Sequence, residues 1–544
     1  MPKHEVDYSL YLVTDSTPAI LGDADIAAVV EAALRGGVTC VQYRDKTSDT
    51  GVLVENARRL HRVTRRYDVP LLINDRVDVA LAVRCEGVHI GQDDLDLKTA
   101  RSILGDDAII GVTVSNVEEV EAACKGGADY LGIGTVFATP TKENTKSIIG
   151  VDGLQQLLIQ IAAAQWPVKT VCIGGINASN VSRVMWQSAA PAGKALDGVA
   201  VVSAIVAAPD PEAASRELRR LVHSPPAFAL NANTTTISPQ QASRSPRELL
   251  DLVPQVIGAV DAAKPLSHNM TNLVVQNFAA NVALAVGASP IMANYGKEAR
   301  DLAALGGALV VNMGTVTPEG LANYLMALRA YNDAGRPVVF DPVGAGATAV
   351  RRSATKTILG GGYIDVLKGN QSEILCCIHT LNTLTPSSPS SPSSSTVPQQ
   401  RGVDSTPSTA TPAALARALQ DLAARRRAVV VMTGATDLVT GPGQPVYAVA
   451  NGHAYLGAVT GTGCCLGTTI SAMVAAWPGD KLAAAVAALL LYNIAAEFAA
   501  EREDVRGPGT FVPAFIDELF RLRKATARGE PGWLERARVE VVGG

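Results

Sequence analysis

The sequence predicts an α/β protein with two large domains, and three observations lead to that class. First, a chain of 544 residues exceeds the size at which a single hydrophobic core keeps growing. Second, hydrophobic residues make up 47% of the chain and aromatic residues only 4%, which suits helices packed on parallel strands. Third, short β-branched runs alternate with helical stretches in both halves of the chain.

Strand-like runs follow one another between Tyr11 and Ile205, with helical stretches between them. The eight runs are YLVTD, VQYRD, LLIND, GVHIG, IIGVTV, YLGIGTV, TVCIGG and GVAVVSAI. Eight such units in succession predict a closed (β/α)8 TIM barrel, which we place at residues 1–225. Barrels of this kind carry their active sites at the C-terminal ends of the strands, so the polar residues that end these runs are candidates for chemistry.

The second half of the chain follows a predicted linker at residues 226–247, which is rich in Pro, Ser and Asn. In residues 248–544, Ala/Leu helical patterns alternate with strand-like ALVVNMG, PVVFDPVG, YIDVLKGN and AVVVMTG. This predicts helices around a mostly parallel sheet. A segment at about 381–412 contains TPSSPSSPSSSTVPQQ and is too polar to bury a core, so we expect a disordered surface insertion there.

Charge and composition narrow the function classes. A formal net charge of −4 and an isoelectric point near 6.0 leave no large basic field, so neither nucleic acid nor a membrane is expected as a partner. The first ten residues, MPKHEVDYSL, lack the apolar core of a signal peptide, and we recognise no uninterrupted apolar run of membrane-spanning length. A soluble, cytoplasmic location is therefore expected. The eight cysteines lack metal-ligand spacing, which predicts reduced thiols without structural zinc.

The run VQYRDK places polar side chains where a barrel interior normally has branched apolar ones. Gln42, Arg44 and Lys46 alternate, so on a strand they would project to one face, at the barrel interior or its mouth. An anion site is the favoured interpretation. The alternative is an edge strand with a solvated polar face.

Carboxylates follow at the ends of the next two runs. Asn74 and Asp75 end LLIND, and Asp93 and Asp94 follow GVHIG. Carboxylates from neighbouring strands can share a hard cation, and Mg²⁺ with a pyrophosphate would satisfy both sets of charges. Taken singly, Asp75 or Asp94 would more often be a helix N-cap.

The last three runs of the barrel end in groups suited to phosphate. Backbone N–H groups at these strand ends commonly hold phosphate in such barrels, so two anions are predicted to meet at one barrel mouth. The residues concerned are Thr139, Thr141 and Lys142 after the sixth run, Gly174 and Gly175 after the seventh, and Val202 and Ser203 after the eighth.

The stretch from Tyr11 to Ile205 resembles thiamine-phosphate synthase through VQYRDK, INDR, HIGQDD, TPTK, IGGI and VVSAI, in that order. The resemblance implies that 4-amino-2-methyl-5-hydroxymethylpyrimidine diphosphate condenses with a thiazole phosphate to give thiamine phosphate and pyrophosphate. It implies three residue sets: Gln42, Arg44, Lys46, Asn74, Thr113 and Lys142 for the pyrimidine diphosphate, with Arg44, Lys46 and Lys142 catalytic; Asp75 and Asp94 for Mg²⁺; and Thr139, Thr141, Gly175, Val202 and Ser203 for the thiazole phosphate. Thr113 stands where the family commonly has Ser, and is expected to be a weaker contact.

In the second half, VTGTGCCLGTT is a Gly-rich turn that leads into an apolar helix, so N–H groups and the helix dipole converge there. This favours an anion hole, although a plain tight turn is the alternative. Three strand ends add polar residues where open α/β sheets bind ligands. These residues are Asp341, Asn370, Glu373, Thr433 and Asp437. Neither a P-loop nor a protein-kinase signature occurs, which leaves a ribokinase-like sheet as the natural candidate for nucleotide binding.

The run from Leu266 to Leu519 resembles hydroxyethylthiazole kinase through SHNMTNLVVQNFAANVALAVGASPIMA, LVVNMGT, DPVGAGAT, KGNQSE, MTGATD, VTGTGC and GPGTFVP. The resemblance implies phosphorylation of 4-methyl-5-(2-hydroxyethyl)thiazole with ATP as co-substrate, and a homo-oligomer built on kinase trimers. It assigns Met292 and Gly461 to the thiazole alcohol, Lys368 and Thr433 to ATP, Asp341 and Glu373 to Mg²⁺, and Cys464 to the place of the catalytic base.

Two of these kinase residues carry a further expectation. A helix N-terminus lowers a thiol pKa, so Cys464 is expected to have a modest role in accepting the proton of the alcohol, with a small buried thiol as the alternative. Lys368 stands where the family often has Arg. The compact ammonium of Lys replaces the planar guanidinium of Arg, and this difference is expected to affect nucleotide affinity.

Together the two resemblances predict a bifunctional enzyme of the fungal type, in which the kinase product is a substrate of the barrel. We expect independent active sites linked by free diffusion. Two other functions remain open at this point: a barrel that acts as a thiazole tautomerase, and a non-catalytic thiamine sensor.

Overall fold

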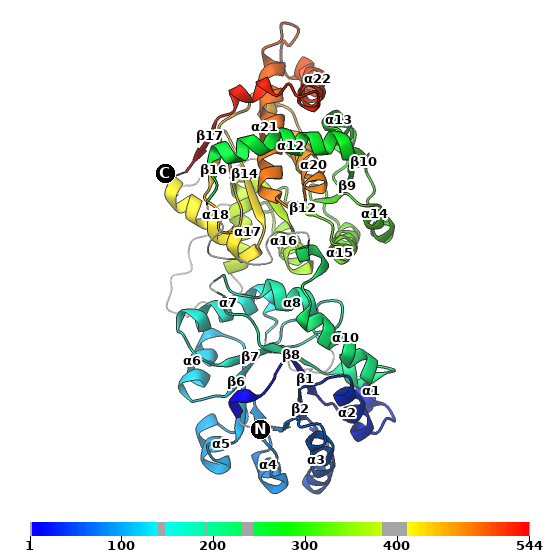
Figure 1. The fold of residues 1–544 in the computed structure, drawn as a ribbon, viewed down its shortest axis with the longest axis vertical. Coiled ribbons are helices and arrows are strands. Elements are labelled where there is room, and N and C mark those ends of the chain that lie inside the picture. The colour runs from blue at the N-terminus through cyan, green and yellow to red at the C-terminus, as the bar shows by residue number, and fades with distance from the viewer. Residues whose placement is uncertain (1–2, 140–146, 192, 231–242, 383–410, 543–544) are drawn as a thin grey trace. The chain divides into compact units, whose positions relative to one another are not determined.

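The computed structural model describes residues 3–139, 147–191, 193–230, 243–382 and 411–542. These residues form two compact units, of which the first ends at Pro226 and the second begins at Ala227 (Figure 1). Thr141 and Lys142, and most of the predicted Ser/Pro insertion, lie outside the described residues.

The first unit is a closed eight-stranded parallel barrel, so the predicted fold is confirmed. Its strands follow in chain order around the barrel, and β1 pairs with β8 to close it. The strands are β1 (Leu10–Val13), β2 (Cys40–Tyr43), β3 (Leu71–Asn74), β4 (Gly87–Ile90), β5 (Ile109–Val114), β6 (Tyr130–Ile133), β7 (Lys169–Ile173) and β8 (Gly198–Val201).

Amphipathic helices surround the barrel (Figure 1). In α2, for example, the Asp25 carboxylate caps the helix and the apolar face, including Val30 and Leu34, packs on the strands. The helices are α1 (Pro18–Leu21), α2 (Ile26–Arg35), α3 (Thr50–Arg65), α4 (Val77–Val83), α5 (Leu97–Leu104), α6 (Val117–Lys125), α7 (Gly150–Ala163), α8 (Val181–Gln187), α9 (Ser203–Val206) and α10 (Pro211–His223).

The barrel has two hydrophobic clusters. The larger lies between the strands and the helices. The smaller includes Tyr8, Tyr11 and Tyr130, so aromatic rings with hydroxyl groups take places that branched apolar side chains usually fill.

One strand is shorter than predicted. β2 ends at Tyr43, so only Gln42 of the alternating polar residues lies on the strand, and Arg44 and Lys46 lie in the loop that follows. The expectation that all three alternate along one strand is therefore wrong, although their place at the barrel mouth does not depend on it.

The second unit has a nine-stranded sheet in the order β10-β9-β11-β12-β13-β14-β15-β16-β17. The strands from β10 to β14 are parallel and the last three are antiparallel, so the predicted mostly parallel sheet is confirmed. They are β9 (Leu266–Met270), β10 (Ser289–Ile291), β11 (Ala308–Asn312), β12 (Val338–Asp341), β13 (Val366–Asn370), β14 (Val429–Thr433), β15 (Asp437–Thr440), β16 (Tyr447–Val449) and β17 (Val539–Val541).

Helices cover both faces of this sheet (Figure 1). Alternate residues of one strand serve the two layers: Val310 packs with one set of helices, and Leu309 and Val311 pack with the other. One layer contains α12 (Pro246–Ala263), α13 (Gln276–Val286), α20 (Thr462–Ala476), α21 (Lys481–Ala500) and α22 (Pro508–Ala527); the other contains α14 (Ala299–Leu305), α15 (Pro318–Asp333), α16 (Ala349–Gly361), α17 (Gln371–Asn382) and α18 (Pro412–Arg426).

Helix α21 corrects one expectation from the sequence. Its 20 residues are long and apolar enough to cross a membrane, so the expectation of no such run is wrong. Its apolar window is 89% buried within the protein, and it packs against α20, α22 and α12. The hydrophobicity of α21 on all sides is that of a core helix.

Part of the predicted linker has regular structure. Ala227–Leu230 form α11, where the ring of Phe228 stacks on that of Tyr363 at 4.4 Å. Ser245 and Glu248 form a capping box at the start of α12. Residues 231–242 lie outside the described residues.

Candidate active sites

A cavity of about 710 Å³ opens in the barrel, lined by residues from the C-terminal ends of its strands and the loops that follow. It brings together ten of the residues that the resemblance to thiamine-phosphate synthase assigns. They are Gln42, Arg44, Lys46, Asn74, Asp94, Thr113, Thr139, Gly175, Val202 and Ser203. The eleventh described residue of that set, Asp75, forms an ion pair with Lys46.

The guanidinium of Arg44 is held by a buried carboxylate. Arg44 Nη1 donates to Asp15 Oδ2 at 3.1 Å, and Asp15 is only 3% exposed. The backbone N–H of Arg44 also donates to Thr14 Oγ1 at 2.9 Å. The loop after β2 is thereby tied to the end of β1, which fixes Arg44 at the cavity.

The two carboxylates predicted to bind Mg²⁺ are not helix caps. Helix α4 has Arg76 as its N-cap residue, and α5 is capped by the Asp96 carboxylate. Asp94 Oδ2 instead accepts the N–H of Gly91 at 2.7 Å, and Asp75 pairs with Lys46. The edge-strand alternative is also excluded, because β2 is buried between two neighbours in a closed barrel.

Gly175 shows why a glycine is needed at the predicted thiazole phosphate site. Its φ is +64°, and a Cβ there would lie 2.8 Å from Phe137 Cβ. A side chain at this position would therefore be strained and would collide with the loop after β6.

In the second unit, α20 begins beside the polar ends of the strands. Gly461 is its N-cap residue, with φ of +89°, and a Cβ there would lie 2.7 Å from Val275 Cγ2. The Tyr492 hydroxyl donates to the Thr462 carbonyl at 2.7 Å and anchors the first turn to α21. The start of α20 is thus a fixed N-terminus, at which backbone N–H groups can bind an anion.

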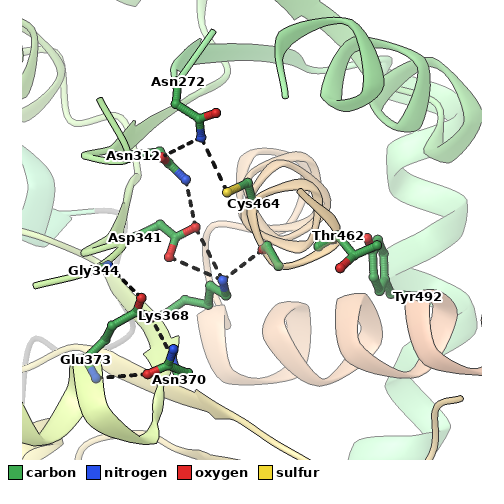
Figure 2. A network of polar contacts seen from close by, with 12 residues as sticks. Asn272, Asn312, Asp341, Gly344, Lys368, Asn370, Glu373, Thr462, Cys464 and Tyr492 are labelled. Carbon is green, nitrogen blue, oxygen red and sulfur yellow. Dashed lines mark hydrogen bonds and ion pairs between the residues drawn. The ribbon is translucent and has the colours of Figure 1, made fainter. Parts of the chain in front are cut away.

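A chain of polar contacts runs across the strand ends to this helix (Figure 2). Asn272 Nδ2 donates to Asn312 Oδ1 at 3.2 Å, and Asn312 Nδ2 donates to Asp341 Oδ2 at 2.9 Å. Lys368 Nζ lies 3.2 and 3.3 Å from the two Asp341 oxygens. It also donates to the Gly463 carbonyl at 2.8 Å, which joins the sheet to the first turn of α20.

Glu373 adds a second buried carboxylate to this site (Figure 2). Its two oxygens accept the N–H groups of Gly344 and Asn370, each at 2.8 Å. Burial and the nearby Asp341 charge raise the pKa of Glu373 to about 7. Lys368, at 3% exposed, interacts with both carboxylates, and the two carboxylates also repel each other.

Comparison with known proteins identifies both units. The thiamine monophosphate synthase family model matches residues 10–205, and the hydroxyethylthiazole kinase family model matches residues 257–525. The chain is 42% identical over 544 residues to the probable thiamine biosynthetic bifunctional enzyme of Schizosaccharomyces pombe, covering 99% of each protein. The chain belongs to the thiamine biosynthetic bifunctional enzymes.

Other relatives match the whole chain or one domain. The thiamine biosynthetic bifunctional enzyme of Saccharomyces cerevisiae is 37% identical over 549 residues, covering 96% of each protein. The hydroxyethylthiazole kinase of Desulforudis audaxviator is 42% identical over 266 residues, covering 49% of this chain and 89% of that one. The first unit is thus a synthase domain and the second a kinase domain, and a kinase domain implies ATP as a co-substrate.

The other predicted residues of the kinase domain lie at or next to strands of its sheet. Met292 follows β10 and packs, partly buried, against the same hydrophobic cluster as Cys464. Thr433 ends β14 and is paired in register with Asn370. Lys368 already binds Asp341 and the Gly463 carbonyl, so its contact with ATP stays a prediction.

The expectation of a lowered thiol pKa at Cys464 is wrong. Burial and the Asp341 charge raise the pKa of this thiol to about 11, even though it lies in the first turn of α20. The Asn272 amide contacts the sulfur at 3.6 Å. At neutral pH the thiol is protonated, so a thiolate is not the resting form at this site.

Several site residues were missed from the sequence. Asp15 and Asn312 each lie at or just beyond the end of a predicted strand, which is the signal that could have identified them. His89 and Tyr11 line the barrel cavity. Both lie within strands, so a prediction based on strand ends does not include them.

Metal binding would need ligands from the substrate. Among the residues that the structure describes, no group of three or more His, Cys, Asp or Glu side chains is arranged to hold a metal ion. Mg²⁺ in phosphoryl chemistry is usually held by one or two carboxylates together with substrate phosphates. In the kinase domain, Asp341 and Glu373 are two buried carboxylates close enough to affect each other's charge.

Asp437 gives a prediction on stability. It is 6% exposed, accepts hydrogen bonds from Gly434 N and Asn493 Nδ2, and burial raises its pKa to about 6. Between about pH 4 and 6 the folded domain keeps a proton that the unfolded chain has released, so the free energy of unfolding falls as pH rises through this window, by about 3 kcal/mol. Asp437→Asn is expected to remove this part of the pH dependence.

The measurement is calorimetric unfolding of the full chain from pH 4 to 8, following the transition that ATP moves to higher temperature. Asp301→Asn, which changes an exposed carboxylate on α14, serves as the control. If Asp437→Asn keeps the slope of Asp301→Asn between pH 4 and 6, the assignment of the raised pKa to Asp437 is incorrect.

Proposed function

We propose that the kinase domain transfers the γ-phosphoryl group of ATP to the hydroxyl of 4-methyl-5-(2-hydroxyethyl)thiazole. The synthase domain then joins the resulting thiazole phosphate to 4-amino-2-methyl-5-hydroxymethylpyrimidine diphosphate, giving thiamine phosphate and pyrophosphate. The observation that carries this proposal is the gathering of Arg44, Lys46 and Asp94 around one cavity, with Asp75 paired to Lys46.

In the synthase domain, the two cations act on the diphosphate. Arg44 is held by Asp15 with part of its fork left for a phosphate, and Lys46 exchanges Asp75 for a phosphate oxygen when the substrate binds. Asp75 and Asp94 hold Mg²⁺, whose charge, when bound, stabilises the leaving pyrophosphate. Lys142 is assigned to the same anion. As the carbon–oxygen bond breaks, a pyrimidine-methyl cation develops and the thiazole nitrogen captures it, so positioning and electrostatics supply the catalysis.

The thiazole phosphate lies on the opposite set of strand ends. Backbone N–H groups at Gly175, Val202 and Ser203 and the hydroxyls of Thr139 and Thr141 bind its phosphate. Gln42, Asn74 and Thr113 contact the pyrimidine side. All of these described residues line the same cavity, which lets the two substrates meet.

In the kinase domain, Asp341 and Glu373 hold Mg²⁺ together with the phosphates of ATP. The raised pKa of Glu373 supports this, because a divalent cation would offset the repulsion between Glu373 and Asp341. Lys368 and Thr433 contact ATP, and Met292 and Gly461 contact the thiazole alcohol. The N–H groups at the start of α20 receive the charge of the transferring phosphoryl group.

Cys464 has a limited part in this scheme. Because its thiol pKa is about 11, the thiolate fraction at neutral pH is small. Cys464→Ala is expected to lower the kinase kcat by about tenfold or less, and Cys464→Ser to stay near the wild type. The rate of thiazole phosphate formation measures this. A fall of about a thousandfold or more in Cys464→Ala would instead make the sulfur an essential base.

The proposed function is tested by product analysis. The full chain is incubated with hydroxyethylthiazole, ATP, Mg²⁺ and the pyrimidine diphosphate, and thiamine phosphate is measured by mass spectrometry. The proposal predicts continuous formation of thiamine phosphate. A non-catalytic thiamine sensor gives no turnover, and a tautomerase makes thiazole phosphate accumulate.

The setting of the enzyme is also part of the proposal. A cytoplasmic location is in keeping with the burial of α21, and neither nucleic acid nor a membrane is proposed as a partner. A homo-oligomer built on kinase trimers is supported by Leu273 and Val274, which are 73% and 75% exposed next to Asn272.

A further inference from the structure

A chain of hydrogen bonds crosses the barrel beneath the cavity. Gln42 Nε2 donates to the Tyr11 hydroxyl, which contacts the Tyr130 hydroxyl, each at 2.8 Å. The Tyr130 hydroxyl contacts His89 Nδ1, and His89 Nε2 contacts Thr113 Oγ1, again at 2.8 Å each. We call these five side chains the relay. Its two ends, Gln42 and Thr113, both line the cavity, whereas Tyr130 is fully buried and does not.

The barrel makes room for the relay at two glycines. A Cβ at Gly111 would lie 2.0 Å from the ring of Tyr130, and a Cβ at Gly132 would lie 2.8 Å from the ring of His89. Either side chain would displace a member of the relay. The absence of a side chain at these two positions of the neighbouring strands thus provides the volume that the two rings occupy.

The hydrogen bonds of the relay must all run in the same direction from donor to acceptor. Burial raises the pKa of Tyr11 and of Tyr130 well above the ordinary value, so each hydroxyl keeps its single proton. His89 contacts Tyr130 through Nδ1 and Thr113 through Nε2, and in either neutral tautomer an imidazole donates from one ring nitrogen and accepts at the other. Each side chain within the relay that donates a hydrogen bond to one neighbour must accept one from its other neighbour. Reversing the hydrogen bond at one end therefore reverses the donor and acceptor roles along the whole relay.

The direction decides what the cavity offers a substrate. When Gln42 donates into the relay, its carbonyl oxygen is left to accept from a ligand and the Thr113 hydroxyl is left to donate. When the relay is reversed, Gln42 donates to the ligand and Thr113 accepts. In either direction, the two ends offer one donor and one acceptor.

We propose that the relay determines specificity for an aminopyrimidine, with Tyr130 and His89 as positioning residues that keep the two ends complementary. The inference rests on the proposed function, in which the pyrimidine ring lies between Gln42 and Thr113. A ring amino group beside a ring nitrogen presents one donor and one acceptor, which matches the relay ends. A ring without the amino group leaves the accepting end unpaired, and an intact relay does not let that end turn to suit the ligand.

Tyr130→Phe tests this, because it removes one oxygen from the centre of the relay and keeps the ring, and Tyr130 itself does not line the cavity. The probes are the pyrimidine diphosphate and an analogue with hydrogen in place of the ring amino group, and the readout is kcat/KM for pyrophosphate release at saturating thiazole phosphate. The intrinsic reactivities of the two probes cancel when variants are compared. We expect the preference for the amino substrate to fall by about tenfold or more.

Tyr8→Phe is the matched control. The ring of Tyr8 packs on that of Tyr130 at 4.7 Å, and its buried hydroxyl has no hydrogen-bond partner among the described residues, so its loss leaves the relay intact. It is expected to keep the wild-type preference. If Tyr130→Phe also keeps that preference while the wild type is active, the relay proposal is wrong and the proposed function stands. If the wild type releases no pyrophosphate from the amino substrate, the proposed function itself fails.

A second pair of variants guards against loss of folding in Tyr130→Phe. Thr113→Ser keeps the hydroxyl at the end of the relay and is expected to keep the preference, whereas Thr113→Val is expected to lose it. The proposal is contradicted if Thr113→Val discriminates between the two probes as well as Thr113→Ser does.

Discussion

Replacing Arg44 with Ala is expected to lower the synthase kcat/KM by about a thousandfold and to leave the kinase rate unchanged. The reason is the loss of a preorganised guanidinium at the point where pyrophosphate charge develops. Arg44 needs no reorganisation for this, because Asp15 and Thr14 already hold it at the cavity. The synthase rate with both substrates and the kinase rate with hydroxyethylthiazole and ATP are measured on the same protein.

Two controls separate this effect from a loss of stability. Arg66→Ala removes a guanidinium that pairs with Glu31 and is 59% exposed, and it should change neither rate. Arg44→Ala leaves Asp15 buried without its cation, although Asp15 keeps its hydrogen bonds from Thr17. Asp15→Asn combined with Arg44→Ala should recover stability but not synthase activity. A synthase rate within tenfold of the wild type in Arg44→Ala would remove this residue from the diphosphate site.

Asp341→Asn is expected to lower the kinase rate by about a thousandfold, since it removes a proposed Mg²⁺ ligand. It also leaves Lys368 buried at 3% exposure without its ion pair, which costs about 3–5 kcal/mol of stability. Both consequences fall on the kinase domain. Calorimetric unfolding and the rate of thiazole phosphate formation measure them separately.

A second substitution tells the two consequences apart. Adding Lys368→Met to Asp341→Asn removes the unpaired buried charge, so the unfolding temperature should recover while the kinase stays inactive. Recovery of kinase activity together with stability would show that Asp341 serves the fold and not the reaction. The synthase rate is the internal control in both proteins.

The barrel could be predicted from the sequence because each of its eight strands is a separate β-branched run with a polar end. The sheet of the kinase domain was predicted only in its centre. β9 escaped notice because its Ser267, His268 and Asn269 are buried through hydrogen bonds, which no hydrophobic pattern reveals. The short antiparallel strands β16 and β17 pair residues about 90 positions apart, so no local signal marks them.

The ends of the predicted strands were enough to locate most site residues, but they did not predict which side chains these residues pair with. Asp341 and Lys368 lie on separate strands, and Arg44 and Asp15 lie in the loops after two separate strands, so only the folded sheet or barrel brings these side chains together. The thiol of Cys464 shows a different limit. The position at a helix start was predicted, but the pKa depends on burial and on the Asp341 charge, neither of which spacing reveals.

We propose that one chain carries two separate active sites that act in succession. The most direct test mixes Arg44→Ala and Asp341→Asn proteins and measures thiamine phosphate formed from hydroxyethylthiazole, ATP and the pyrimidine diphosphate. Each variant alone should form almost none, with thiazole phosphate accumulating only in Arg44→Ala, and the mixture should restore formation through free diffusion. Two results would show that the chain does not work through two separate sites linked by diffusion: a mixture that stays inactive while each protein keeps its intact partial reaction, or either variant alone forming thiamine phosphate at the wild-type rate.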